Sequence, residues 1–106
     1  MRLTDAELKA LFSKNVTIHQ AQFSHAFTTG GCVFVSGYRA PYDGQYVLDG
    51  AKVCSTLPSE RTCRALFRSP DGDLWWGEYR PGEAQVNYIM RVDVERTPTT
   101  SKGICP

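Results

Sequence analysis

Two histidines are the candidates for acid–base or metal chemistry in this chain. His25 stands between Phe23 and Phe27, in a segment where residues alternate with the period of a β-strand. If that strand lines a barrel, the imidazole points into the lumen, where it could contact a ligand or transfer a proton and where burial lowers its pKa. His19 lies six residues earlier, so strict alternation places both rings on one face.

A structural role is the alternative for His25. The ring could hydrogen bond within an aromatic cluster, or face solvent after a shift in register. A metal site would need a carboxylate beside the two histidines, and the sequence forces none there. We therefore predict no metal and no cofactor, and keep His25 as a ligand-contacting residue.

Aromatic side chains are the candidates for a binding surface. Trp75 and Trp76 are adjacent on a predicted strand, so one points into the core and the other points outward or toward a cavity. Tyr79 follows on the same strand, and Tyr38 and Tyr42 lie in a predicted loop. An exposed tryptophan with neighbouring tyrosines is a common interface anchor. The alternative is a cross-strand aromatic pair that only stabilises the sheet.

Other catalytic patterns are poor. The sequence has no Gly-x-Ser-x-Gly, phosphate-loop or dinucleotide motif. Asp71 and Asp73 are better explained by a turn than by a cation loop. Arg64 and Arg68 share a face, but acidic residues such as Glu78 are close enough in sequence to neutralise them. We therefore expect a solvated charged face there, and no anion site.

The cysteines indicate disulfide bonds. Four cysteines in 106 residues is a high density, typical of chains from an oxidising compartment. Cys54 and Cys63 flank a polar loop that contains Pro58, so we predict a bridge across its base. Cys32 could then pair with Cys105 and tether the C-terminal tail. Closing the two loops stabilises the fold by about 3 and about 4 to 5 kcal/mol in the chain-entropy model, and the cysteine spacing does not fit a zinc site.

The predicted disulfides indicate export. The chain opens on Met1-Arg2-Leu3-Thr4 and shows no leader peptide, so we expect a mature periplasmic or secreted domain whose leader has been replaced by an initiating methionine. The alternative is a cytosolic protein with four reduced thiols.

Length and charge narrow the classes of partner. A chain of 106 residues with 42% hydrophobic residues fits one globular domain, residues 1–106. A net charge of +1 gives no electrostatic case for nucleic acid. No apolar run approaches the length of a membrane-spanning helix, so we predict no membrane span.

The N-terminal segment predicts a helix over residues 4–14. Thr4 and Glu7 have the spacing of a capping box, with Asp5 in the first turn. A helix this short must dock on an apolar surface to persist. The residues that share its apolar face are Leu8, Leu11 and Phe12, with Leu3 just before the cap.

Residues 16–95 predict antiparallel strands. Asp49-Gly50 and Pro70-Asp71-Gly72 are hairpin turns, the segment from Gly37 to Gly44 is a loop, and residues 97–106 are a polar tail. The last strand places Val86 to Val94 on one apolar face, with polar residues between them. Seven or eight short strands remove exposed edges by closing. We therefore predict a mainly β fold, a small antiparallel meander or up-and-down β-barrel with a short N-terminal helix.

The orientation of the disulfide is open at this point. If Cys63 shared the inward face with Phe67, pairing with Cys54 would turn Lys52 inward as well. A bulge near Val53 or an outward-facing disulfide would resolve the conflict.

The pattern Gly-x-Tyr-x-Leu-x-Gly-x-x-Val-Cys from Gly44 to Cys54 is followed by Cys63 and by an aromatic-rich strand after Asp71-Gly72. Together with the opening segment from Leu3 to Phe12, it resembles small exported β-barrel proteins of proteobacteria, most of which are domains of unknown function. The chain is also similar in size and architecture to bacterial metalloprotease inhibitors, which are eight-stranded barrels with one disulfide. Its four cysteines depart from that pattern, and neither resemblance assigns a functional residue.

Three functions are compatible with these patterns. The first is a non-enzymatic exported module that binds a protein or a small apolar ligand through an aromatic surface. The second is a protein inhibitor or immunity-type protein, and the third is a small enzyme that uses His25 in the lumen. The expected binding residues are Trp75, Trp76, Tyr79, Tyr38, Tyr42 and His25.

Overall fold

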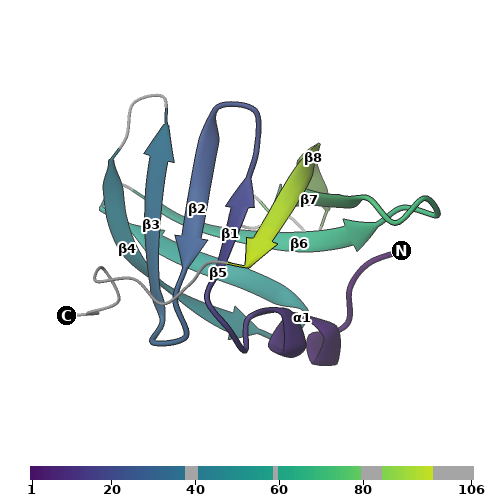
Figure 1. Ribbon diagram of the computed structural model, residues 1–106, viewed down its shortest axis with the longest axis horizontal. Helices are drawn as coiled ribbons and strands as arrows, with labels where there is room; N and C mark the ends of the chain where they lie inside the picture. The colour runs from purple at the N-terminus through teal and green to yellow at the C-terminus, as the bar shows by residue number, and fades with distance from the viewer. Residues whose placement is uncertain (38–40, 59, 80–84, 97–106) are drawn as a thin grey trace.

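The computed structural model describes residues 1–37, 41–58, 60–79 and 85–96. In this part of the chain, the helix α1 (Asp5–Leu11) is followed by eight strands. The strands are β1 (Val16–His19), β2 (Phe23–Phe27), β3 (Cys32–Gly37), β4 (Tyr42–Asp49), β5 (Lys52–Leu57), β6 (Glu60–Arg68), β7 (Leu74–Tyr79) and β8 (Val86–Arg96). Each strand pairs antiparallel with the next, and β8 pairs with β1 (Figure 1). The predicted up-and-down barrel is confirmed.

The capping box fixes the start of α1. The Thr4 hydroxyl accepts a hydrogen bond from the Glu7 backbone N–H at 3.2 Å, and the Thr4 N–H donates to the Glu7 carboxylate at 3.0 Å. Burial of Glu7 is slight, and its hydrogen bond to the Thr4 backbone lowers the pKa of the carboxyl group. The predicted helix start is therefore correct.

The predicted helix end was wrong by three residues. The helix stops at Leu11, because Phe12 takes a non-helical backbone conformation (φ −90°, ψ 10°). The Ser13 hydroxyl donates a hydrogen bond to the backbone carbonyl of Ala10 at 2.7 Å. This bond gives a partner to one of the last carbonyls of the helix, which a further helical turn would otherwise have satisfied. The Phe12 ring is buried against the barrel.

Helix α1 closes one end of the barrel. The Phe12 ring packs edge-on against Phe27 with 5.1 Å between ring centroids, and against Tyr46 at 5.6 Å. Leu8 and Leu3 are also buried at this end. Figure 1 shows α1 at the lower end of the barrel, the same end as the β2–β3 turn. The opposite end of the barrel, near the β1–β2 turn, has no helix across it in the described residues.

Alternation along each strand separates an inner face from an outer face. His25 of β2 contacts Trp76 of β7 across the interior, with 4.9 Å between ring centroids, although these strands are not neighbours in the barrel. Because partners in register share a face, Trp76 and Leu66 identify the inner face of β6 and β7.

The predicted loop from Gly37 to Gly44 was too long. Strand β4 already begins at Tyr42, where it continues the ladder with β3. Residues 38–40 lie outside the described part of the chain.

The Cys54–Cys63 disulfide faces outward. The two residues are direct partners on β5 and β6 with 4.0 Å between their Cα atoms, which confirms the predicted bridge. Their neighbours Val53 and Arg64 point inward, so the cysteines point away from the core. Of the two resolutions that the sequence left open, the outward-facing disulfide is the one found, and Phe67 shares the outer face with Cys63.

The second predicted bridge cannot be followed to both of its ends. Cys32 is buried at the start of β3. Cys105 and the tail of residues 97–106 lie outside the described part of the chain.

Among the described residues, no helix has the length and apolarity needed to cross a membrane.

A bulge between β7 and β8 corrects the predicted face of the last strand. The register shifts between Trp76 and Glu78, so Val86 pairs with the outward residue Tyr79, whereas Val92 is buried inside. Alternation cannot reveal an extra residue in one strand of a pair. A single apolar face from Val86 to Val94 was therefore wrong.

Candidate functional site

His25 lies in the barrel interior, as the lumen hypothesis required. It is 4% exposed and packs between aromatic rings, stacked on Phe27 at 6.3 Å and edge-on to Trp76 at 4.9 Å. Burial lowers the pKa of His25 from 6.5 to about 3, with a smaller contribution from the positive charge of Arg64. The imidazole is therefore neutral at pH 7, and its Nε2 has no hydrogen-bond partner among the described residues.

His19 does not join His25. The turn between β1 and β2 interrupts the alternation, so Ile18 faces inward and His19 faces outward. Its Nδ1 lies 2.7 Å from the Ser24 hydroxyl, and its Nε2 lies 3.9 Å from a carboxylate oxygen of Glu95. The predicted common face was wrong, and the described residues contain no group of three metal-ligating side chains.

Arg64 is an inward-facing cation that the sequence interpretation missed. It is 8% exposed, so its assignment to a solvated charged face was wrong. Its Nη2 donates to the Glu78 carboxylate at 3.1 Å, and its guanidinium centre lies 4.7 Å from the centre of the Trp76 ring. Burial lowers the pKa of Arg64, an effect that Glu78 opposes. Its Nε has no partner among the described residues.

The open end of the barrel holds a cavity of about 190 Å³. Trp76, which is 2% exposed, belongs to the core beside this cavity, and its indole N–H donates to the Gln20 side chain at 3.0 Å. The exposed ring of Tyr42 reaches the cavity from the start of β4. The residues that line the cavity are Gln20, Phe23, His25, Val35, Tyr42, Leu57, Glu60, Arg64 and Glu78. We call this the mouth cavity.

A second group of aromatic residues lies outside the barrel. Trp75 and Tyr79 point away from the core on β7, in register with Phe67 and Cys63 of β6. The Tyr79 ring has the Lys52 ammonium 4.5 Å from its centre and the guanidinium centre of Arg2 at 5.4 Å. We call the outward residues of β5, β6 and β7, together with Arg2, the outer aromatic face; its described members are Arg2, Lys52, Cys54, Thr56, Arg61, Cys63, Ala65, Phe67, Trp75, Gly77 and Tyr79.

The predicted binding residues therefore fall into two sites. His25, Trp76 and Tyr42 lie in or beside the mouth cavity. Trp75 and Tyr79 lie on the outer aromatic face, as expected for one tryptophan of an adjacent pair pointing outward. Tyr38 lies outside the described residues.

The sequence does contain a signal for the inward placement of Arg64 and Glu78. The turn Pro70-Asp71-Gly72 fixes the register of the β6–β7 hairpin, and this register pairs Arg64 with Glu78 and Leu66 with Trp76. Recognising Trp76 as the inward tryptophan would have placed the ion pair in the lumen.

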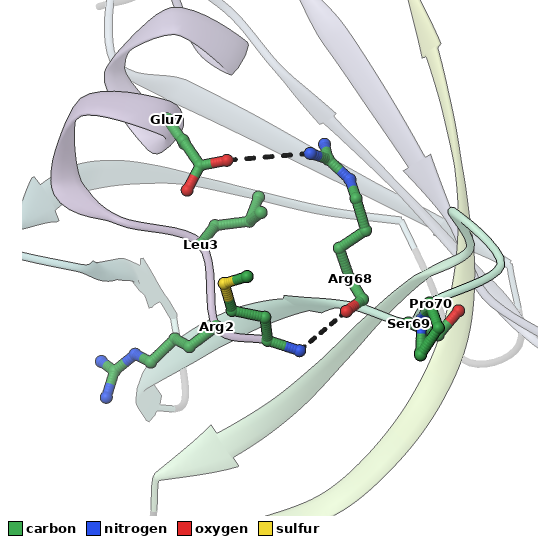
Figure 2. A pocket seen from close by; sticks show the side chains of 7 residues that line it. Arg2, Leu3, Glu7, Arg68, Ser69 and Pro70 are labelled. Carbon is green, nitrogen blue, oxygen red and sulfur yellow. Dashed lines mark hydrogen bonds and ion pairs between the residues drawn. The ribbon is translucent and has the colours of Figure 1, made fainter.

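A further cavity of about 240 Å³ lies between the N-terminal segment and β6 (Figure 2). Two backbone hydrogen bonds tie Met1 to Arg68, each 2.7 Å long, and the Arg68 guanidinium lies 3.7 Å from the Glu7 carboxylate. These contacts hold the N-terminal segment against the end of β6. We interpret this cavity as a gap that remains where the N-terminal segment packs against the barrel.

The geometry of His25 does not suit general acid–base catalysis. A base with a pKa of about 3 is far from the near-neutral value that favours proton transfer at pH 7. The charge that acts on the ring is the Arg64 cation, whereas a catalytic dyad would have a carboxylate to orient the ring. The arrangement can hold a polar ligand, but it gives little support to the enzyme hypothesis.

Comparisons with known proteins leave the function to be argued from the structure. No family model, no curated protein and no solved structure matches the chain.

Proposed function

We propose that the protein is a non-enzymatic, exported binding module that docks an acidic protein partner on its outer aromatic face. The observation that carries the proposal is the placement of Tyr79 between two cations on the outside of the barrel, with Trp75 on the same strand face. Aromatic side chains flanked by arginine are the groups most often enriched in the centre of protein interfaces.

Charge supports an acidic partner. The described outward residues of β5, β6 and β7 include the cations Lys52 and Arg61 but no carboxylate, and Arg2 adds a third positive charge beside them. Asp49 lies opposite Lys52 at the β4 edge of this face, so the positive charges there outnumber the negative ones. A face with an excess of one sign steers a partner of opposite sign.

Rigidity supports the same role. The Cys54–Cys63 disulfide joins β5 to β6 within this face. On the β8 side, Val86 and Ile89 pack over Gly77, where a Cβ atom would collide with both. Ile89 is 55% exposed, so apolar surface continues beyond Tyr79. A rigid face loses little conformational entropy when a partner docks.

The disulfide and the absence of a membrane-spanning helix in the described residues are compatible with export. We extend this to a periplasmic or secreted location, because structural disulfides persist in oxidising compartments. The likeness to small exported barrels of proteobacteria points the same way.

The test is a capture experiment on extracytoplasmic extract with matched variants. Trp75→Ala and Arg61→Glu alter the outer aromatic face, whereas Lys14→Glu makes the same charge change at an exposed position after α1. We expect wild type and Lys14→Glu to retain one partner with an acidic surface, and both face variants to lose it. Retention should fall as salt is raised, since exposed charges are screened.

Capture that is indifferent to both face variants would refute the proposed surface. Capture of a partner with a basic surface would refute its chemistry.

A further inference from the structure

The mouth cavity has the features of a built ligand site. It lies at the end of the barrel opposite α1, lined by residues from the β1–β2 end and from β3 to β7. At about 30 Å³ per water molecule, its volume of about 190 Å³ holds about six water-sized groups. This is well below the size of a drug-like pocket, so any occupant is small.

Two buried polar side chains at this cavity lack hydrogen-bond partners. Arg64 and His25 are each more than nine-tenths buried, and the described residues leave Arg64 Nε and His25 Nε2 unpaired. An arginine Nε is a donor only, so what it lacks is an acceptor. A buried polar group without a partner destabilises the fold, and a ligand acceptor at Arg64 would remove this cost.

The charges that line the cavity favour a ligand that carries a positive group in addition to a hydrogen-bond acceptor. Glu60 and Glu78 contribute two carboxylates and Arg64 one guanidinium, whereas His25 is neutral. The lining therefore has one excess negative charge, and Glu60 carries it at the exposed start of β6. A simple anion would be repelled at the rim, and a simple cation would meet Arg64 inside.

Apolar side chains complete the lining. Phe23, Val35 and Leu57 contribute from β2, β3 and β5, and the Tyr42 ring adds an aromatic face at the opening. A ligand that uses all these groups has an acceptor at one end, a positive charge at the other and a small apolar body.

We propose that the mouth cavity binds a small zwitterion with the dimensions of a free α-amino acid that has a short aliphatic side chain. Its carboxylate accepts from Arg64 and His25, its ammonium group faces Glu60 and Glu78, and its side chain packs in the apolar part of the lining. This site is separate from the outer aromatic face, so either proposal can fail alone.

The test is an NMR titration of the full, oxidised chain with three related probes. L-valine carries both charges, 3-methylbutanoate lacks the ammonium group, and isobutylamine lacks the carboxylate. The reporters are the Arg64 Nε–H signal and the Trp76 indole N–H signal, because Arg64 lines the cavity and the indole N–H donates to Gln20, which also lines it. We expect saturable shifts with valine and at least about tenfold weaker binding of each half-molecule.

Two variants sharpen the result. Glu60→Gln changes an exposed residue and should weaken valine binding while strengthening the binding of 3-methylbutanoate, because it removes a carboxylate that repels this anion. Arg61→Glu, on the outer aromatic face, should change neither. Equal binding of 3-methylbutanoate or of isobutylamine would overturn the zwitterion assignment. So would the lack of a saturable shift at about 10 mM valine, where a ligand with a Kd of about 1 mM occupies most sites.

Discussion

Titration of one buried residue, His25, should make this barrel less stable in acid. Its pKa is about 3 in the folded state and 6.5 in the unfolded chain, because burial disfavours the imidazolium. Between these values the unfolded chain binds more protons than the native state, so stability rises with pH. The stability associated with neutral His25 is fully present above pH 6.5 and is lost as pH falls toward 3.

The linkage relation gives the magnitude. A shift from 6.5 to about 3 corresponds to a loss of about 3 kcal/mol between pH 8 and pH 4, and about 5 kcal/mol well below pH 3. Such a loss is a large fraction of the stability of a small domain. The charged groups around the ring oppose one another, with Arg64 disfavouring the imidazolium and the carboxylates of Glu60 and Glu78 also lining the cavity.

The assay compares urea denaturation of wild type, His25→Gln and His19→Gln at pH 8 and pH 4 under non-reducing conditions. Changes common to all three proteins, such as carboxylate titration, cancel in the comparison. His25→Gln removes the buried titrating ring and should lose about 3 kcal/mol less than wild type between the two pH values. His19→Gln makes the same substitution at the half-exposed outward histidine and should lose as much as wild type. Equal losses for wild type and His25→Gln would refute the reasoning, whatever their stabilities at pH 8.

Three further predictions concern stability measured by urea denaturation. Gly77→Ala should destabilise the fold by about 1 to 3 kcal/mol, since its Cβ would collide with Val86; an unchanged midpoint would contradict the close packing of β7 and β8. Cys54→Ala combined with Cys63→Ala should remove about 3 kcal/mol, and a loss near zero would mean that the unfolded chain is already constrained there. Thr4→Ala should remove about 1 kcal/mol by breaking the capping box, whereas Thr4→Ser, which keeps the hydroxyl, should restore most of it.

The closed barrel and its hairpins were predictable because their determinants are local. Turn residues fix hairpin register, and the change from helical to alternating period marks the boundary between α1 and β1. Cys54 and Cys63 could be paired for the same reason, since a short hairpin brings them opposite each other.

The faces of the strands were harder to predict. Alternation defines two faces but does not say which is inside, and each turn or bulge can reverse the answer. The β1–β2 turn separated His19 from His25, and the bulge at Trp76 moved Val86 outward. Arg64 was predicted on the wrong face because its charge was given more weight than its position in the alternating pattern. Its partner Glu78 lies opposite it in the hairpin.

The two ends of the barrel differ in the side chains that fill them. The interior of an eight-stranded barrel is wide enough to be filled by its own side chains or to hold one small ligand. At the α1 end its own side chains fill it, with Phe12, Phe27 and Tyr46 in mutual contact. At the other end, the inward positions hold His25 and the Arg64–Glu78 pair beside an unfilled cavity.

Apolar residues at these inward positions would meet the needs of packing better. A buried ion pair is often no more stabilising than hydrophobic residues of similar volume, and an unpaired imidazole nitrogen is unfavourable inside a fold. Local rules of packing are broken at the mouth and obeyed at the α1 end, and such breaks are expected where a site must bind something. This contrast between the two ends is the reason for proposing a ligand at the mouth cavity, where Arg64 Nε and His25 Nε2 have no partner among the described residues.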